Sequence, residues 1–184
     1  KALENSVKDI VLFNQMACSS PHVLFFEKSR YSIEEIGQKM KGYFEKLPDK
    51  FLKQELPEGT AANIINIRGM YLMQEERGIL KSEDLGWTIL INKDINLEDP
   101  VQGKVIFIKE INIVDVVIGF ITRKIQAMIV CILDSEKRRA FSKKATYKGV
   151  DRIVFPGKIH DFILPWDGIL ILNRLVRWVI IKDK

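Results

Sequence analysis

The stretch GWTILINKD (residues 86–94), followed after a short loop by KVIFIKEI (104–111), has the most regular pattern in the chain. Both segments are short, rich in apolar and β-branched residues, and bounded by Gly, Pro, Asn or Asp, which is typical of β-strands. Three further strands are predicted on either side of this pair. They are HVLFFE (22–27), AMIVCIL (127–133) and DRIVF (151–155).

Helices are predicted between these strands. Ser32 with Glu35 three residues later is a capping-box signature, and the helix it opens should run to Pro48. Asn112 can cap a helix over 113–125. Strand-helix alternation of this kind predicts an α/β fold with a mainly parallel sheet flanked by helices. The other predicted helices are 4–15, 60–78, 135–147 opened by Ser135, and 168–181. The last of these is expected to pack on the sheet, because it has apolar residues at helical spacing: Ile169, Leu172, Leu175, Val176 and Val179.

The composition is that of a globular protein. Of 184 residues, 47% are hydrophobic and 29% charged, enough for one sizeable core, so we expect a single domain over 1–184. No apolar run approaches the roughly 20 residues of a membrane helix, and no signal-peptide pattern opens the chain. Two cysteines argue against a disulfide scaffold and favour a cytoplasmic location.

Cys18 is the main candidate for chemistry. It lies in NQMACSSPH (14–22), a polar, turn-prone stretch between a predicted helix and a predicted strand. A thiolate at such a junction is a strong nucleophile if substrate can reach it. The residues alone leave a second interpretation open, a loop cysteine without function. Cys131, inside AMIVCIL, is expected in the core.

Other chemical motifs are scarce. His22 and His160 are the only histidines; His22 is interpreted as structural, and His160 has Asp161 beside it on a segment whose neighbours should face opposite ways. We find neither zinc-ligand spacing nor a glycine-rich phosphate loop, so no metal is expected. The basic run EKRRAFSKK (136–144) lacks the interleaved aromatic residues of a nucleic-acid platform, so it is a solvated helix face or a docking surface for an acidic partner or a ligand phosphate.

Three segments carry a family resemblance. FNQMACSSP (13–21) resembles the nucleophile loop of the LuxC-type acyl-CoA reductases, in which an aromatic-Asn-Gln run precedes a Cys-Ser-Pro or Cys-Ser-Ser-Pro motif. The long segment GVDRIVFPGKIHDFILPWDGILILNRLVRWV (149–179) is similar to the closing part of that family, and RKIQAMIV (123–130) fits a shorter pattern. Residues 48–85 add nothing to the resemblance.

The resemblance implies a fold, a cofactor and a mechanism. The family resembles aldehyde dehydrogenases, which join a dinucleotide-binding domain to a catalytic α/β domain. We therefore expect 1–184 to be the catalytic domain alone, with the cofactor domain upstream. Cys18 would attack a fatty acyl thioester, carried by coenzyme A or by a protein, and NADPH, bound mainly by the absent domain, would reduce the acyl-cysteine to a fatty aldehyde.

Specific residue roles also follow from the resemblance. The Cys18 backbone N–H would donate to the oxyanion, and Asn14, Gln15, Ser19 and His160 would lie near the substrate. Asp167 and Gly168 would form a turn that caps the last helix. Expected partners are the acyl thioester, an acyl-transferring protein and a second copy of the chain. The alternatives are a cysteine acyltransferase or thioesterase, and a non-catalytic interaction module.

Overall fold

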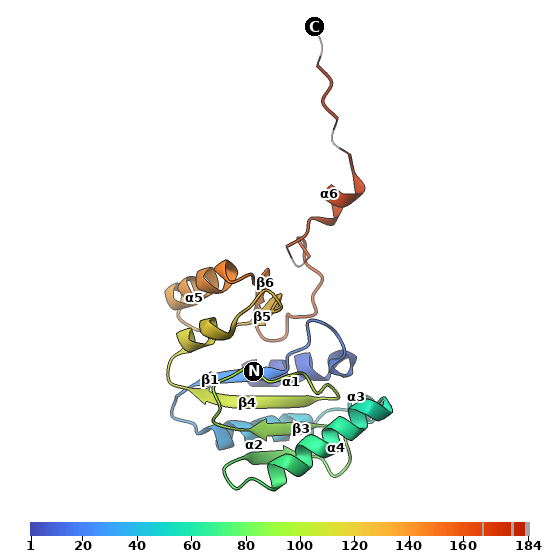
Figure 1. Cartoon of the computed structure of the whole chain (residues 1–184), viewed down its shortest axis with the longest axis vertical. Helices are drawn as coiled ribbons and strands as arrows, with labels where there is room; N and C mark the ends of the chain where they lie inside the picture. The colour runs from blue at the N-terminus through green and yellow to red at the C-terminus, as the bar shows by residue number, and fades with distance from the viewer. Residues whose placement is uncertain (167, 178, 183–184) are drawn as a thin grey trace.

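A four-stranded sheet in the order β1-β4-β3-β2 is the centre of the molecule (Figure 1). The computed structural model describes residues 1–166, 168–177 and 179–182. β4 pairs in parallel with both β1 and β3, and β2 closes one edge antiparallel to β3, so the sheet is mainly parallel as predicted. The strands are β1 (Val23–Glu27), β2 (Gly78–Lys81), β3 (Thr88–Ile91) and β4 (Val105–Ile111).

Both faces of the sheet are covered, which explains why the central strands are apolar throughout. Successive side chains of a strand point to opposite faces. Ile89, Ile106 and Ile108 therefore pack with the buried residues of α1 (Ala2–Val11) and α2 (Ile33–Phe44), while Leu90, Val105 and Phe107 pack against α4 (Glu58–Leu72) on the other face. The short helix α3 (Asp49–Leu52) lies between α2 and α4 in the sequence.

A smaller unit follows the sheet. Its two parallel strands, β5 (Ala127–Ile129) and β6 (Arg152–Val154), flank helix α5 (Ser135–Tyr147) in the sequence. Phe141 of α5 belongs to a small core that also holds Ile111 at the end of β4, so the unit shares apolar contacts with the main sheet (Figure 1).

Helix starts are set by local caps. The predicted capping box is confirmed, because the Ser32 side chain accepts from the Glu35 backbone N–H and the Glu35 carboxylate accepts from Ser32 N. At α5 the cap is Asp134, not Ser135, since the Asp134 carboxylate accepts from two backbone N–H groups of the first turn. A carboxylate at that position also matches the positive end of the helix.

Several predicted boundaries need correction. The helix predicted over 4–15 ends at Val11 and continues as a distorted 3₁₀ turn, η1 (Leu12–Gln15). The helix predicted over 60–78 ends at Leu72, and Gly78 instead begins β2. Residues 113–125 form only a 3₁₀ turn, η2 (Val114–Phe120), which Asn112 does not cap; valines within it resist a helix interior.

The C-terminal prediction was wrong. The helix expected over 168–181 is a five-residue turn, α6 (Ile171–Leu175), whose N-cap is Leu170, and Asp167 lies outside the described residues. Its apolar side chains do not pack on the sheet: Leu172 is 65% exposed and Leu175 is 74% exposed. Figure 1 shows this segment extending away from both sheets. Among the described helices none is long and apolar enough to span a membrane.

Deletion of residues 170–184 should therefore cost little stability. Because the described side chains of this segment are exposed, we expect the melting temperature to change by less than about 2 °C, whereas Phe44→Ala, which empties a fully buried site, should cost about 3–5 kcal/mol. Thermal unfolding followed by circular dichroism measures both. A fall of more than about 5 °C on deletion would show that the segment packs on the domain.

Candidate functional site

A left-handed turn precedes the Cys18 loop. Phe13, Asn14 and Gln15 have φ of 54°, 53° and 61°, a conformation that costs a residue with a β-carbon roughly 1–2 kcal/mol. Three such residues in a row persist only if the surrounding structure fixes them, and backbone strain of this kind collects at functional sites. The turn redirects the chain from the end of α1 toward Cys18.

Two buried side chains hold this turn. The Gln15 side chain is completely buried, and its Nε2 donates to Pro21 O at 2.6 Å and to Val105 O at 2.8 Å. Lys104, also completely buried, donates from Nζ to Asn14 Oδ1. Burial lowers the pKa of Lys104, and the charge of Asp84 opposes this. The turn is therefore tied directly to the start of β4.

Lys104 ends a second left-handed run. Gln102, Gly103 and Lys104 have φ of 70°, 60° and 63°, immediately before β4 begins. Gly103 is needed here for space as well, because a β-carbon would lie 2.7 Å from Ile64 Cδ1. The two left-handed segments thus face each other across the Lys104–Asn14 hydrogen bond.

Cys18 is exposed, and the residue after it contacts His160. Ser19 Oγ lies 3.2 Å from His160 Nδ1, and His160 Nε2 lies 3.0 Å from the carbonyl oxygen of Asp9. A carbonyl can only accept, so Nε2 carries a proton, and when the ring is neutral Nδ1 can accept from the Ser19 hydroxyl. The Phe13 ring packs edge-on against the imidazole, with centroids 5.2 Å apart.

Asp9 fixes the segment that carries His160. Its Oδ2 accepts from the backbone N–H of Gly157 at 2.6 Å, while its own carbonyl holds His160. Burial raises the pKa of Asp9, and the hydrogen bond from the Gly157 N–H acts in the opposite direction. Gly157 has φ of 88°, and a β-carbon there would lie 3.0 Å from Asn5 Nδ2, so α1 requires a glycine at this contact.

Unsatisfied polar atoms gather around the same loop. In the described part of the chain, Gln15 Oε1, Ser20 Oγ and His22 Nδ1 are buried without a hydrogen-bond partner. Buried polar groups are normally paired, so an unpaired group calls for a functional explanation or a bound water. Three of them within eight residues of sequence mark the Cys18 loop as unusual in its hydrogen bonding.

The predicted site residues divide into two groups. Ser19 and His160 come together beside Cys18, although 141 positions separate them. Asn14 and Gln15, predicted near the substrate, instead turn their amides inward, to Lys104 and to backbone carbonyls. Sequence reasoning missed Asp9 and Lys104, because no local pattern distinguishes them from ordinary surface charges.

Cys131 is not a core residue. Strand β5 ends at Ile129, two positions before it, and the Cys131 side chain is exposed. Both cysteines therefore contact solvent, and exposure does not set Cys18 apart. What distinguishes Cys18 is its neighbours, the Ser19–His160 pair and the left-handed turn. No group of three metal-ligating side chains occurs among the described residues.

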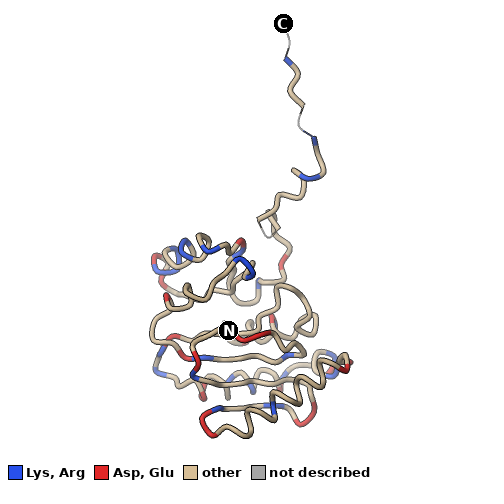
Figure 2. The backbone as a smooth tube through the Cα atoms, viewed as in Figure 1, with Lys and Arg blue, Asp and Glu red and all other residues tan. Residues whose placement is uncertain are grey.

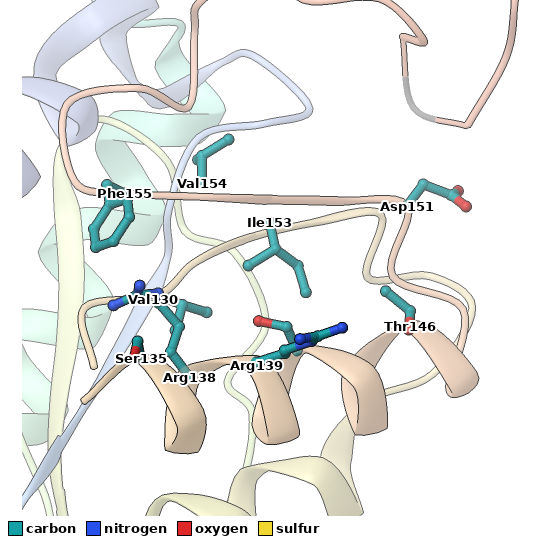
Figure 3. A pocket seen from close by; sticks show the side chains of 10 residues that line it. Val130, Ser135, Arg138, Arg139, Thr146, Asp151, Ile153, Val154 and Phe155 are labelled. Carbon is teal, nitrogen blue, oxygen red and sulfur yellow. The ribbon is translucent and has the colours of Figure 1, made fainter. Parts of the chain in front are cut away.

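A basic cleft of about 530 Å³ lies apart from this loop. Figure 2 shows Lys and Arg gathered along α5, and Figure 3 shows the cleft between α5 and β6. Arg138 and Arg139 line it, and Arg138 donates to Ile132 O and lies over the Phe155 ring. No residue of the Cys18 loop lines it, so the basic run, predicted as a solvated helix face or a docking surface, belongs to a separate surface.

The described residues do not fit a dinucleotide. A pyrophosphate is usually held by free backbone N–H groups at a helix N-terminus. Here three helix N-termini carry acidic groups: Glu34 and Glu35 at α2, Glu58 in the first turn of α4, and Asp134 at α5. A carboxylate at these ends competes with a bound phosphate and repels it.

Comparison with known proteins identifies the family. The model of the acyl-CoA reductase (LuxC) family matches residues 1–178, and the chain belongs to that family. The resemblance inferred from the Cys18 loop and the closing segment is thereby confirmed. A search of curated proteins found no significant match.

Solved structures show the same fold in aldehyde dehydrogenases. Apo betaine aldehyde dehydrogenase from Staphylococcus aureus, with a BME-modified cysteine, superposes with a TM-score of 0.66 at 13% identity, covering 87% of this chain and 35% of that one. An aldehyde dehydrogenase from Bacillus cereus superposes with a TM-score of 0.61 at 11% identity, covering 83% of this chain and 34% of that one. A bifunctional proline utilization A protein superposes with a TM-score of 0.62 at 13% identity, covering 84% of this chain and 17% of that one. The chain thus spans about a third or less of each.

His22 should make stability depend on pH. Burial lowers the pKa of His22, so the folded state favours the neutral ring. Below pH 6.5 the unfolded chain binds a proton that the folded chain resists, and the free energy of unfolding falls as the pH drops. We expect His22→Gln to lose less stability than wild type between pH 8 and pH 5, as measured by urea unfolding. Equal losses in both proteins would show that His22 contributes nothing to the pH dependence.

Proposed function

We propose that this chain is the nucleophile-bearing domain of an acyl-CoA reductase, with Cys18 as the residue that takes up the acyl group. One observation carries the proposal: the exposed Cys18 lies between a strained left-handed turn and a Ser19–His160 hydrogen bond. Membership of the acyl-CoA reductase family and the aldehyde dehydrogenase fold support it.

The first chemical step is activation of the thiol. Neutral His160, held by Asp9 O, has an unprotonated Nδ1 that accepts from the Ser19 hydroxyl. Ser19 Oγ takes the Cys18 proton while its own proton moves to Nδ1, which leaves a thiolate and an imidazolium. A positioned base of this kind typically contributes 10²–10⁴-fold in rate.

The thiolate then attacks the thioester carbonyl. A C–S bond forms, the carbonyl oxygen becomes an oxyanion, and the Cys18 backbone N–H is placed by analogy to stabilise it. The bond to the coenzyme A sulfur breaks, and the leaving thiolate takes the proton from the His160 imidazolium. The product is an acyl-cysteine, with His160 returned to its neutral form.

Release of an aldehyde needs a hydride, which a nicotinamide cofactor supplies when bound. We propose NADPH as that donor, held by a part of the enzyme other than the residues described here. The acidic helix N-termini of this chain and the roughly one-third coverage of the dehydrogenases support this division of roles.

Acylation tests the proposal directly. Incubation with a long-chain acyl-CoA should give a single acyl adduct on intact-mass spectrometry, located on Cys18 by peptide mapping. Cys18→Ser should give no thioester adduct, Cys131→Ser should react like wild type, and His160→Gln should react on the order of 100-fold more slowly. An adduct on Cys131, or none on wild type, would refute the assignment.

Thioester hydrolysis is the second candidate function, because Ser19 Oγ lies 3.2 Å from His160 Nδ1 and so places a hydroxyl beside a candidate general base. Hydrolysis would release free fatty acid from acyl-CoA, whereas the reductase proposal predicts an acyl-cysteine that persists until a hydride donor arrives. The amount of free fatty acid per enzyme over several hours separates the two functions.

The isolated chain should bind NADPH weakly. Because its helix N-termini carry acidic groups, calorimetric titration should show no binding below about 1 mM, and acyl-loaded protein should form no aldehyde on addition of NADPH. Binding in the micromolar range would place the cofactor site within these residues and overturn the division of roles.

A further inference from the structure

We infer that Lys104 is a positioning residue for the Cys18 nucleophile. The inference rests on the proposed function, in which Cys18 is the reactive thiol, and it adds a residue that neither the family motifs nor the Cys18 loop contains. Lys104 lies in the loop before β4, and its Nζ reaches Asn14, the middle residue of the left-handed turn.

Burial makes this contact consequential. Lys104 has no exposed surface, and Asn14 is 8% exposed. Asn14 Oδ1 is the one hydrogen-bond acceptor recorded for Lys104 Nζ in the described part of the chain. Removing the ammonium therefore leaves the Asn14 side chain without its donor at a site that solvent cannot easily reach.

The backbone conformation of Asn14 also depends on this hydrogen bond. A residue with a β-carbon resists the left-handed region, and asparagine tolerates it better than most. The Lys104 hydrogen bond adds to that tolerance by fixing the Asn14 side chain. We call Asn14, Lys104 and their hydrogen bond the clasp. When the clasp opens, the turn can relax to ordinary φ values, and Ser19 is no longer held against His160.

Lys109 provides a matched control. It is also completely buried and follows on β4, but its Nζ donates to Asn96 Oδ1 and Glu98 Oε1, and neither belongs to the Cys18 loop. A variant at Lys109 loses a buried lysine without touching the clasp. Cys131 is an internal reference, because it is exposed and lies outside the clasp.

The test compares the two thiols in the same molecule. In wild type, iodoacetamide at pH 7 should alkylate Cys18 about tenfold faster than Cys131, because the Ser19–His160 pair can take up the thiol proton as the new C–S bond forms. Lys104→Met should bring the ratio of the two rates close to 1, and Lys109→Met should leave it near the wild-type value. Neither acyl-CoA nor cofactor is needed, so this test can fail independently of the acylation test.

Replacing Asn14 by glycine should restore the Cys18 reactivity lost in Lys104→Met. No such recovery is expected if Lys104 only stabilises the fold. Asn14→Gly adopts the left-handed region without cost, so the double variant Lys104→Met/Asn14→Gly should regain a ratio within about threefold of wild type. If Lys104→Met does not fold, Asn14→Ala opens the same clasp from the other side, and Asn14→Asp, which keeps the acceptor, should behave like wild type.

Hydrogen–deuterium exchange of the peptide covering residues 12–20 measures directly whether the clasp is closed. Lys104→Met should speed exchange there at least tenfold, and Lys109→Met should not. The proposal is overturned if the thiol ratio is near 1 in wild type, if Lys104→Met leaves both readouts unchanged, if Lys109→Met changes them equally, or if the glycine rescue fails.

Discussion

The side-chain amide of Gln15 is the contact on which the geometry around Cys18 depends. With its two N–H groups it joins Pro21, two positions before β1, to Val105, the first residue of β4, and it does so from within the left-handed turn. Without a buried donor there, two carbonyl groups at the edge of the sheet would be unpaired, at a cost of about 1–3 kcal/mol for each. The loop is therefore hydrogen-bonded to the end of the parallel β1–β4 pair and continues from it.

Much of the fold could be predicted from local pattern. The strand pair containing Ile89 and Ile106 is apolar on both faces, and the capping box at Ser32 is a local signal, so both were confirmed. The prediction of a long C-terminal helix was wrong, because apolar residues at helical spacing show what a helix could bury and not whether a partner surface exists. The prediction that Cys131 lies in the core was wrong for a related reason. An apolar run does not reveal where a strand ends, and here β5 ends at Ile129.

From local pattern alone, the candidate site was predictable only where its residues are neighbours in sequence. The polar context around Cys18 singled it out, and the family resemblance added Ser19 and His160. Lys104 and Asp9 were missed because their roles depend on pairings across 90 and 148 positions, formed only when the sheet and the segment after β6 are in place. In sequence Asp9 is one more charge on an amphipathic helix. In the fold it is 2% exposed and holds the backbone that carries His160.

The long separation between Asn14 and Lys104 has a consequence for biosynthesis. The two residues are 90 positions apart, so at about 5–20 residues per second the ribosome adds Lys104 roughly 5–18 s after Asn14. During that interval the nascent chain carries a cysteine whose supporting lysine and strand do not yet exist. The thiol is then exposed to any oxidant or electrophile it meets, and it acquires its folded surroundings only when β4 has emerged and paired with β1.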